Sequence, residues 1–223
     1  MNPEEIKAAV LDARIGRTME ALEKHNICAH YAKTIDDAAK IAFGLTEKGS
    51  TISCGGSVTL KESGIFAEMQ SGDYRFLDRS VEGLTPEEID ELYRRSFFAD
   101  VYFTSANAIT ENGELYNVDG NANRVAAMCY GPRKVIVIAG ANKIVRTLDE
   151  AIERVKCEAA PCNALRLNTA TPCQTLGKCS GSGRGMTAGC AAEGRMCCQY
   201  LVTGYQRQRG RLHVIICPEA LGY

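Results

Sequence analysis

The sequence has no large excess of charge of either sign. Its 223 residues carry a formal net charge of −1, and the acidic and basic residues are mixed along the chain. Binding to nucleic acid or to an anionic membrane depends on a concentrated basic surface, and no segment of the sequence offers one. We therefore expect neither nucleic acid nor a membrane surface among its partners.

Long apolar segments are missing as well. No window approaches roughly 18 uninterrupted apolar residues, so we expect no transmembrane helix. The N-terminal segment mixes acidic and basic side chains and lacks the apolar core of a secretion signal. These absences predict a cytoplasmic protein. Thiols stay reduced in the cytoplasm, and eleven cysteines is an odd number, so a set of structural disulfides is not expected.

The eleven cysteines fall into two groups. Four of them lie inside apolar segments, where a thiol usually behaves as a small buried hydrophobe: Cys28, Cys54, Cys129 and Cys217. The other seven lie between Cys157 and Cys198, where the sequence has little else to bury. Most of this region's second half is glycine, small polar residues and arginine, so apolar burial alone would not offset the entropy lost on ordering it.

Helical and strand-like patterns alternate along the chain. Helical spacing or a capping signal is found near residues 4–25, 35–48, 58–70, 86–98, 123–131 and 147–159. Strand-like segments are found near residues 27–32, 50–54, 75–79, 99–107, 133–140, 199–206 and 211–219. This alternation predicts an α/β fold with a mostly parallel sheet and right-handed crossovers. Without an internal repeat or a linker, we expect one domain over residues 1–223, with a cysteine-rich insertion at about 157–198.

Polar loops follow three of the predicted strands. In open α/β sheets, ligands bind beyond the carboxyl ends of the strands, and helix N-termini there favour anions. The first loop holds Gly55, Gly56 and Ser57, which would let the backbone approach an anion or would simply make a tight turn. The third holds Asn142 and Lys143; the lysine either neutralises a phosphate or carboxylate or lies on the surface.

The second loop region, residues 104–124, is the richest in short polar side chains. Asn107, Asn117 and Asn121 are candidates for binding a polyol, a sugar phosphate or a nucleotide, although such residues also bond their own loops as Asx turns. Asp119 lies between asparagines and just before Arg124. A carboxylate held there is a candidate acid or base, and a turn aspartate is the alternative.

Taken together, these segments resemble the LUD family, which is named for lactate utilisation. The resemblance lies in GGSVTLKESG, TSANAITENGELYNVDGNANRVAAM, GPRKVIVIAGANKIV and the closing GRLHVIICPEALGY, and it spans nearly the whole chain. It implies a Rossmann-like, mostly parallel sheet similar to that of sugar-phosphate isomerases and CoA transferases, with a small added β element. It also implies that the protein acts together with iron–sulfur partner proteins in lactate oxidation. The fold relatives further suggest a homodimer.

The resemblance further selects four of the clustered cysteines. Short members of the family carry four cysteines near the end of the chain, and the matching positions here are Cys173, Cys179, Cys190 and Cys197. The first and last spacings are kept, while SGSGRGMTAG lengthens the middle one. Family context favours a [4Fe–4S] cluster over zinc at these thiols, and unmetallated thiols are the third reading. Cys157 and Cys162 are alternative ligands, and Cys198 is an additional cysteine that is not expected to bind the metal.

Three functions are compatible with these patterns. The first is a redox or electron-transfer component that binds a small anionic metabolite or nucleotide beside the cluster. The second is a non-redox ligand-binding domain or an enzyme of the isomerase or CoA-transferase type, with Asp119 as its acid or base. The third is a structural assembly subunit whose cysteine flap binds zinc or keeps free thiols and docks a partner protein.

Overall fold

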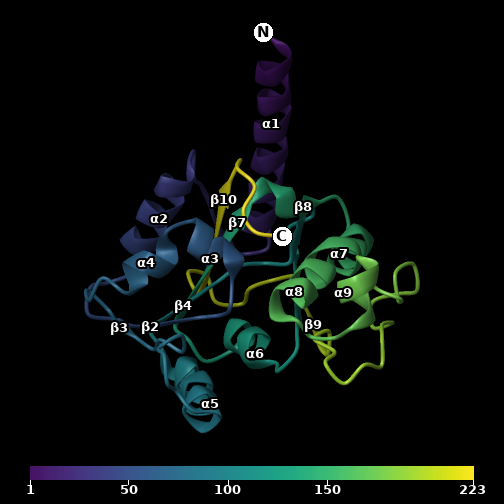
Figure 1. Ribbon diagram of the computed structural model, residues 1–223. Coiled ribbons are helices and arrows are strands. Elements are labelled where there is room, and N and C mark those ends of the chain that lie inside the picture. The colour runs from purple at the N-terminus through teal and green to yellow at the C-terminus, as the bar shows by residue number, and fades with distance from the viewer.

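The computed structural model describes all 223 residues and consists of two β-sheets with helices packed against them (Figure 1). The larger sheet has the strand order β1-β10-β7-β4-β2-β3, and every pairing in it is parallel. Its strands are β1 (Cys28–Tyr31), β2 (Thr51–Cys54), β3 (Arg75–Phe76), β4 (Val101–Thr104), β7 (Lys134–Gly140) and β10 (Leu212–Cys217). The predicted Rossmann-like α/β architecture is confirmed.

The central strand β7 shows why both faces of this sheet are covered. Its residues are buried almost throughout, as expected for a parallel strand between two layers. Val135 and Val137 pack with α1 (Pro3–Lys24) and α6 (Asn123–Cys129). Ile136 and Ile138 pack on the other face with α2 (Ile35–Gly44), α3 (Val58–Glu62) and α4 (Ile65–Met69). Alternate side chains along one strand therefore serve two separate cores.

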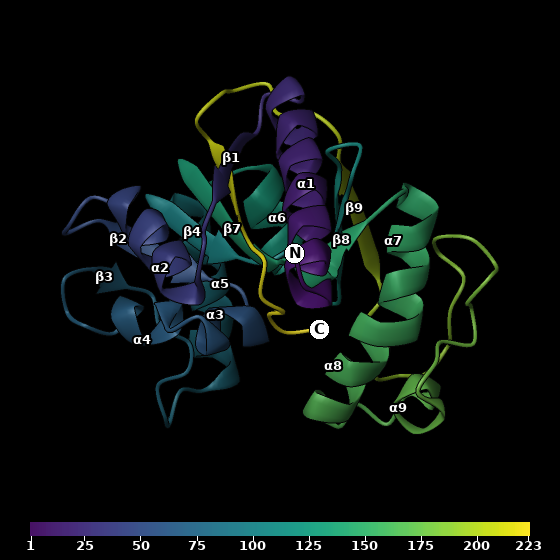
Figure 2. The same cartoon turned by 90° about the horizontal axis from the view of Figure 1, so that it is seen from above.

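The smaller sheet is the added β element. It has the order β8-β5-β6-β9, with β5 (Ala108–Thr110), β6 (Leu115–Asp119), β8 (Ile144–Val145) and β9 (Gln199–Thr203). A turn at Asn112–Gly113 joins the antiparallel pair β5 and β6. Gly113 has φ +89°, and a side chain there would meet the backbone of Ala21 at 2.6 Å, so glycine is required. Helices α7 (Leu148–Arg154) and α8 (Ala160–Leu167) pack beside this sheet (Figure 2).

Local capping explains where several helices begin. Asn2 caps α1 and Thr85 caps α5 (Pro86–Arg95), each in a capping box with the glutamate three residues on. Thr34 accepts a bond from the backbone N–H of Asp37 and so starts α2. These starts match the sequence-based expectation, but α2 ends at Gly44 rather than near Lys48.

Three other elements differ from expectation. The helix predicted over residues 58–70 is split in two at Gly64, which has φ +71°. The strand predicted over residues 75–79 is only the two-residue β3. The helix predicted to end near residue 159 continues through a π-helical turn, Val155–Ala159, into α8. Pro161 lacks an N–H and cannot continue a regular ladder, and a π turn precedes it.

The cysteine-rich region therefore starts inside a helix rather than at an irregular boundary near residue 157. After α8 it contains one short helix, α9 (Pro172–Leu176), and no regular element from Gly177 to Cys198. We call residues 168–198 the flap. It lies beside α7 and α8 and ends at β9 (Figure 1).

The four cysteines in apolar segments are not all buried. Cys54 and Cys217 are buried, and Cys28 is half-buried. Cys129 is exposed, which corrects the expectation for it, because the last turn of the short helix α6 turns this residue to solvent. None of the helices combines the length and the apolar character that a membrane span requires.

Candidate functional site

A cavity of about 570 Å³, here called the main cavity, lies between the polar loops, α8 and the flap. This volume is in the range typical of sites for small ligands, roughly 300–1,000 Å³. Six of the predicted ligand-binding and acid–base residues line it: Gly56, Ser57, Asn107, Asp119, Asn121 and Lys143. Parallel strands place the loops that follow β2, β4 and β7 at one edge of the sheet, which brings segments distant in the sequence together.

The other three predicted ligand residues support the cavity from behind rather than lining it. Gly55 leaves room for Arg124, because an added Cβ would lie 2.9 Å from the Cδ of that arginine. Asn117 is fully buried and accepts a bond from Arg124 at 2.7 Å. Asn142 holds the C-terminal segment, because its amide donates to the carbonyl of Gly222 and accepts from the N–H of Leu221.

Arg124 was not predicted as a site residue, yet it organises this wall. Its guanidinium donates to Asn107 Oδ1 at 3.1 Å, to Asn117 Oδ1 at 2.7 Å and to the carbonyl of Val118 at 2.6 Å. Its side chain is only 13% exposed. The sequence signal was available, since Arg124 stands inside the dense asparagine motif, but an arginine there could as easily have faced solvent.

Asp119 is anchored by the backbone. Its carboxylate accepts bonds from the N–H groups of Gly120, Arg124 and Val125, at 3.2, 3.0 and 3.2 Å. These bonds fix the loop that leads into α6, so the turn role is realised. Because the side chain also lines the main cavity, the role of acid or base stays a prediction.

Lys143 differs from an ordinary surface lysine. It is 3% exposed, and its Nζ donates to Thr59 Oγ1 at 2.8 Å and to Ser105 Oγ at 2.9 Å. It forms no ion pair with a carboxylate. Burial, together with the nearby cations Arg154 and Arg124, lowers the pKa of Lys143 to about 7. The sequence placed this residue at the correct edge of the sheet but did not reveal its burial.

The main cavity carries more positive than negative groups. Arg79, Arg166 and Arg195 line it along with Arg124 and Lys143, against Asp119 and Glu193. Arg79 donates to the hydroxyl of Tyr93 at 2.6 Å and Arg166 to that of Tyr223 at 2.6 Å, and neither is within ion-pair distance of a carboxylate. Guanidinium groups with unused donors bind carboxylates and phosphates well. The cavity therefore suits a small anion.

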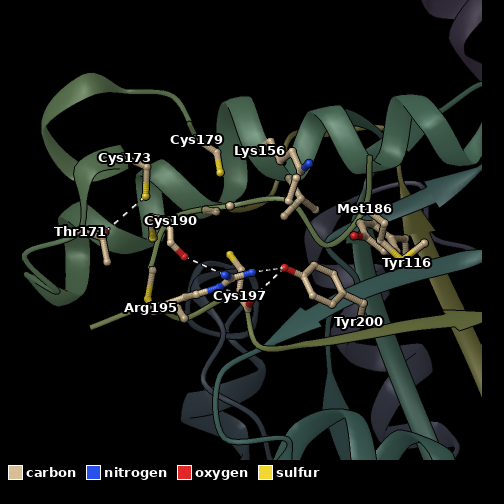
Figure 3. Close-up of a pocket in the computed structure, with 15 residues that line it drawn as sticks. Tyr116, Lys156, Thr171, Cys173, Cys179, Met186, Cys190, Arg195, Cys197 and Tyr200 are labelled. Atoms are coloured by element: carbon tan, nitrogen blue, oxygen red, sulfur yellow. Dashed lines mark hydrogen bonds between the residues drawn. The ribbon is translucent and has the colours of Figure 1, made fainter. Parts of the chain in front are cut away.

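A second, much smaller cavity of about 30 Å³ lies under the flap, and we call it the cysteine cavity. All four selected cysteines line it: Cys173, Cys179, Cys190 and Cys197. Figure 3 shows Cys173 on α9 above Cys190, and the sulfur of Cys179, on the following loop, pointing toward Cys197. Three other cysteines are exposed and do not line the cysteine cavity: the alternative ligands Cys157 and Cys162, and the additional Cys198.

The thiols in this cavity influence one another. Burial, and after it the neighbouring Cys179 and Cys173, raises the pKa of the Cys197 thiol to about 11. Two of the sulfurs have polar contacts: Cys179 Sγ accepts from the N–H of Gly181 at 3.4 Å, and Cys173 Sγ lies 3.3 Å from Thr171 Oγ1. In the absence of a metal, the cavity therefore favours the neutral thiol at Cys197.

Two buried or half-buried cations hold the flap in place. Lys156 is 5% exposed and donates to the carbonyls of Gly181 and Gly185. Arg195 donates to the carbonyls of Cys190 and Cys197 at 2.7 and 2.8 Å (Figure 3). Neither forms an ion pair with a carboxylate, so the cysteine cavity has positive charge beside it that thiolates would balance.

This donor set fits a thiolate-bound metal by residue type. In their present positions, however, no group of three or more His, Cys, Asp or Glu side chains is placed to hold a metal ion.

Comparison with known proteins identifies the family. The sequence model of the LUD domain matches residues 15–217, which is nearly the whole chain. The chain belongs to the LUD domain family. Membership supports a lactate-utilisation-type function in general terms, and it names neither a ligand nor a cofactor.

Among solved structures, the LUD protein described here is similar to a DUF162 family protein from Deinococcus radiodurans. The two share 15% sequence identity, and the match covers 93% of this chain and 98% of the other with a TM-score of 0.47. No curated protein matches the sequence.

The two cavities of this LUD protein are adjacent. Arg195, Met196 and Cys197 line both of them. One side of this short segment faces the four cysteines and the other faces the basic pocket. A chemical change at the thiols is therefore placed to act on whatever occupies the main cavity.

Proposed function

We propose that this LUD protein is a redox component of the lactate-utilisation type. It binds a small anionic metabolite in the main cavity and holds a [4Fe–4S] cluster on the four cysteines of the flap. The observation that carries the proposal is the position of Cys197, which lines both the cysteine cavity and the main cavity.

The anion is supported by the charge of the main cavity. Arg79 and Arg166 present guanidinium groups without carboxylate partners, and Gly56 and Ser57 line the same cavity. A carboxylate or phosphate bound there would replace water around these cations. Asn107 and Asn121 would supply neutral hydrogen bonds and so contribute to selectivity.

The cluster is supported by the four thiols that line one cavity and by Lys156 and Arg195, which would balance thiolate charge. When bound, such a cluster accepts and releases single electrons. Cys173, Cys179, Cys190 and Cys197 would be its ligands, and the N–H of Gly181 would stabilise sulfur charge. An electron-transfer role in turn implies a partner protein, for which an iron–sulfur protein in the cytoplasm is our expectation.

Anaerobic reconstitution with iron and sulfide tests this proposal. We expect brown protein with matched amounts of iron and acid-labile sulfide and broad absorption in the visible range. Cys190→Ser and Cys173→Ser should lose most of that absorption. Cys198→Ser, next to a proposed ligand but outside the cavity, is the matched control and should keep it. Colourless protein without iron after reconstitution would rule out the cluster, and colourless protein with stoichiometric zinc would support the zinc alternative.

A non-redox ligand-binding or isomerase-like function is the second candidate, and one observation favours it. Apart from Cys197, the main cavity is lined by residues other than cysteine, so it can bind a ligand without any metal. Thermal-shift measurements with CoA esters, sugar phosphates and nucleotides distinguish the two. Strong stabilisation by one of these, in protein that takes up no iron, would favour the second candidate.

A further inference from the structure

Lys143 has a hydrogen-bond arrangement that is unusual for a lysine. The hydroxyl of Thr59 donates its only hydrogen to the carbonyl of Leu221 at 3.3 Å, and that of Ser105 donates to the carbonyl of Ile138 at 2.6 Å. Both hydroxyls can then act only as acceptors toward Lys143. Two hydrogens of the nitrogen are used, and no other protein atom bonds to it.

This arrangement matches a neutral amine. A neutral –NH₂ group has two hydrogens and one lone pair; Thr59 and Ser105 accept both hydrogens, and no carboxylate lies within ion-pair distance to favour the ammonium. With both hydrogens held by Thr59 and Ser105, the lone pair is the part of the nitrogen without a partner. Because Lys143 lines the main cavity, a ligand there can reach this lone pair.

On balance, the charges around Lys143 also lower its pKa and so favour the neutral amine. Arg154, from α7, and Arg124, from α6, disfavour a further positive charge, while Glu62 and Glu158 oppose them. Arg154 is already bonded to Glu158 at 2.9 Å, so that carboxylate is shared. Burial is the largest influence and also lowers the pKa.

We propose that Lys143 is a nucleophilic amine that forms an imine with the carbonyl carbon of a small anionic ligand, of which a 2-oxo acid is the simplest case. The inference rests on the proposed function in one respect, that the main cavity binds a small anion. Arg79 or Arg166 would hold the carboxylate, and the carbonyl would face Lys143.

The reaction is balanced and neither oxidises nor reduces the ligand. The Nζ lone pair adds to the carbonyl carbon, a C–N bond forms, and the carbonyl π electrons move to the oxygen. That oxygen takes up the proton that the nitrogen releases. Loss of one water from this adduct then gives the C=N bond, so amine and carbonyl become imine and water.

The neutral form gives Lys143 a large kinetic advantage over exposed lysines. With a pKa of about 7, about half of the Lys143 side chains are neutral at pH 7. An ordinary lysine with a pKa of about 10.4 is neutral about a thousandfold less often. Reaction with a carbonyl compound near neutral pH should therefore concentrate on one residue.

Borohydride trapping tests the inference directly. The full-length protein is incubated with pyruvate or glyoxylate at pH 7 and reduced, and the adducts are located by peptide mass mapping. We expect one adduct, at Lys143, with the mass of the oxo acid less one oxygen. Lys143→Arg, which keeps a cation but loses the nucleophile, should show none. Exposed Lys61 and buried Lys156 in the same digest serve as internal controls.

The result that overturns the inference is an absence of adduct at Lys143, whether or not exposed lysines are modified. A parallel thermal-shift titration of the wild-type protein with lactate and inorganic phosphate separates this failure from failure of the proposed function. Stabilisation by these anions without trapping at Lys143 refutes the imine and leaves the anion site standing. If the anions do not stabilise the protein and no adduct forms at Lys143, both the imine and the anion site are refuted.

Discussion

Replacing Lys143 by methionine should change how the stability of the protein depends on pH. The folded-state pKa of this lysine is about 7, against about 10.4 in an unfolded chain. Above pH 7 the folded lysine is largely neutral, while the unfolded one still binds a proton. Because the unfolded state then binds more protons, the stability of the wild-type protein gains a contribution that rises with pH.

The size of this contribution follows from the shift. Each pKa unit corresponds to about 1.4 kcal/mol, so a protonated and buried Lys143 costs about 5 kcal/mol below pH 7. Between pH 7 and pH 9 about 2 kcal/mol of that cost should disappear. Lys143→Met also loses the bonds to Thr59 and Ser105, but that loss does not vary with pH. The slope of the difference between the two proteins therefore isolates the amine.

Urea denaturation from pH 6 to pH 9 at constant ionic strength provides the measurement. We expect the wild-type protein to gain about 2 kcal/mol relative to Lys143→Met between pH 7 and pH 9, and to gain little between pH 6 and pH 7. A difference that stays constant over the whole range would show that Lys143 is charged in the folded protein, and it would remove the physical basis for a nucleophilic amine.

Four further predictions concern the rest of the molecule. Arg124→Met should lower the free energy of unfolding by about 2 kcal/mol in urea denaturation, because it leaves the buried Asn117 Oδ1 without its donor, while Asn107 Oδ1 keeps the N–H of Val118. The exposed control Arg133→Met should change the free energy of unfolding little. Gly181→Ala should speed the reaction of the flap cysteines with a thiol reagent, because an added Cβ would overlap the carbonyl of Ala188 and so displace the flap that covers them. In the control Gly204→Ala, where nothing lies within 4 Å of an added Cβ, the cysteines should react as in the wild type. Gly113→Ala should lower the melting temperature, because it combines φ +89° with a clash against Ala21, and an unchanged melting temperature would contradict the close packing of this turn against α1. Burial lowers the pKa of both His30 and His213 below the unfolded value of about 6.5. Their contribution to stability should therefore be present above about pH 6.5 and be lost as the pH falls below it. His30→Gln should reduce that loss, as measured by urea denaturation at pH 5.5 and 7.5.

The fold was predictable because its signals are local. Capping residues such as Thr34 and Thr85 mark helix starts, and the apolar run of β7 marks a strand between two layers. The ends of elements were less predictable, because Gly64 and Pro161 change the local geometry in ways that depend on packing. Cys129 shows the same limit: an apolar neighbourhood in the sequence did not decide which way a residue at a helix end faces.

The candidate site was predictable as a set of loops but not as a set of roles. The rule that ligands bind beyond the carboxyl ends of parallel strands placed Ser57, Asn107 and Lys143 together correctly. Which side chains would line the cavity and which would support it depends on tertiary contacts, so Asn117 and Asn142 were misplaced. Arg195 was missed because it acts through carbonyls that only the folded flap brings together.

Electron paramagnetic resonance tests most directly whether the cysteine cavity and the main cavity lie close enough to influence each other. The reconstituted protein is reduced with dithionite under anaerobic conditions, and spectra are recorded with and without saturating pyruvate. Because Arg195, Met196 and Cys197 line both cavities, we expect the bound anion to shift the g values of the reduced cluster. A cluster whose spectrum is identical in the presence of a bound anion would contradict it.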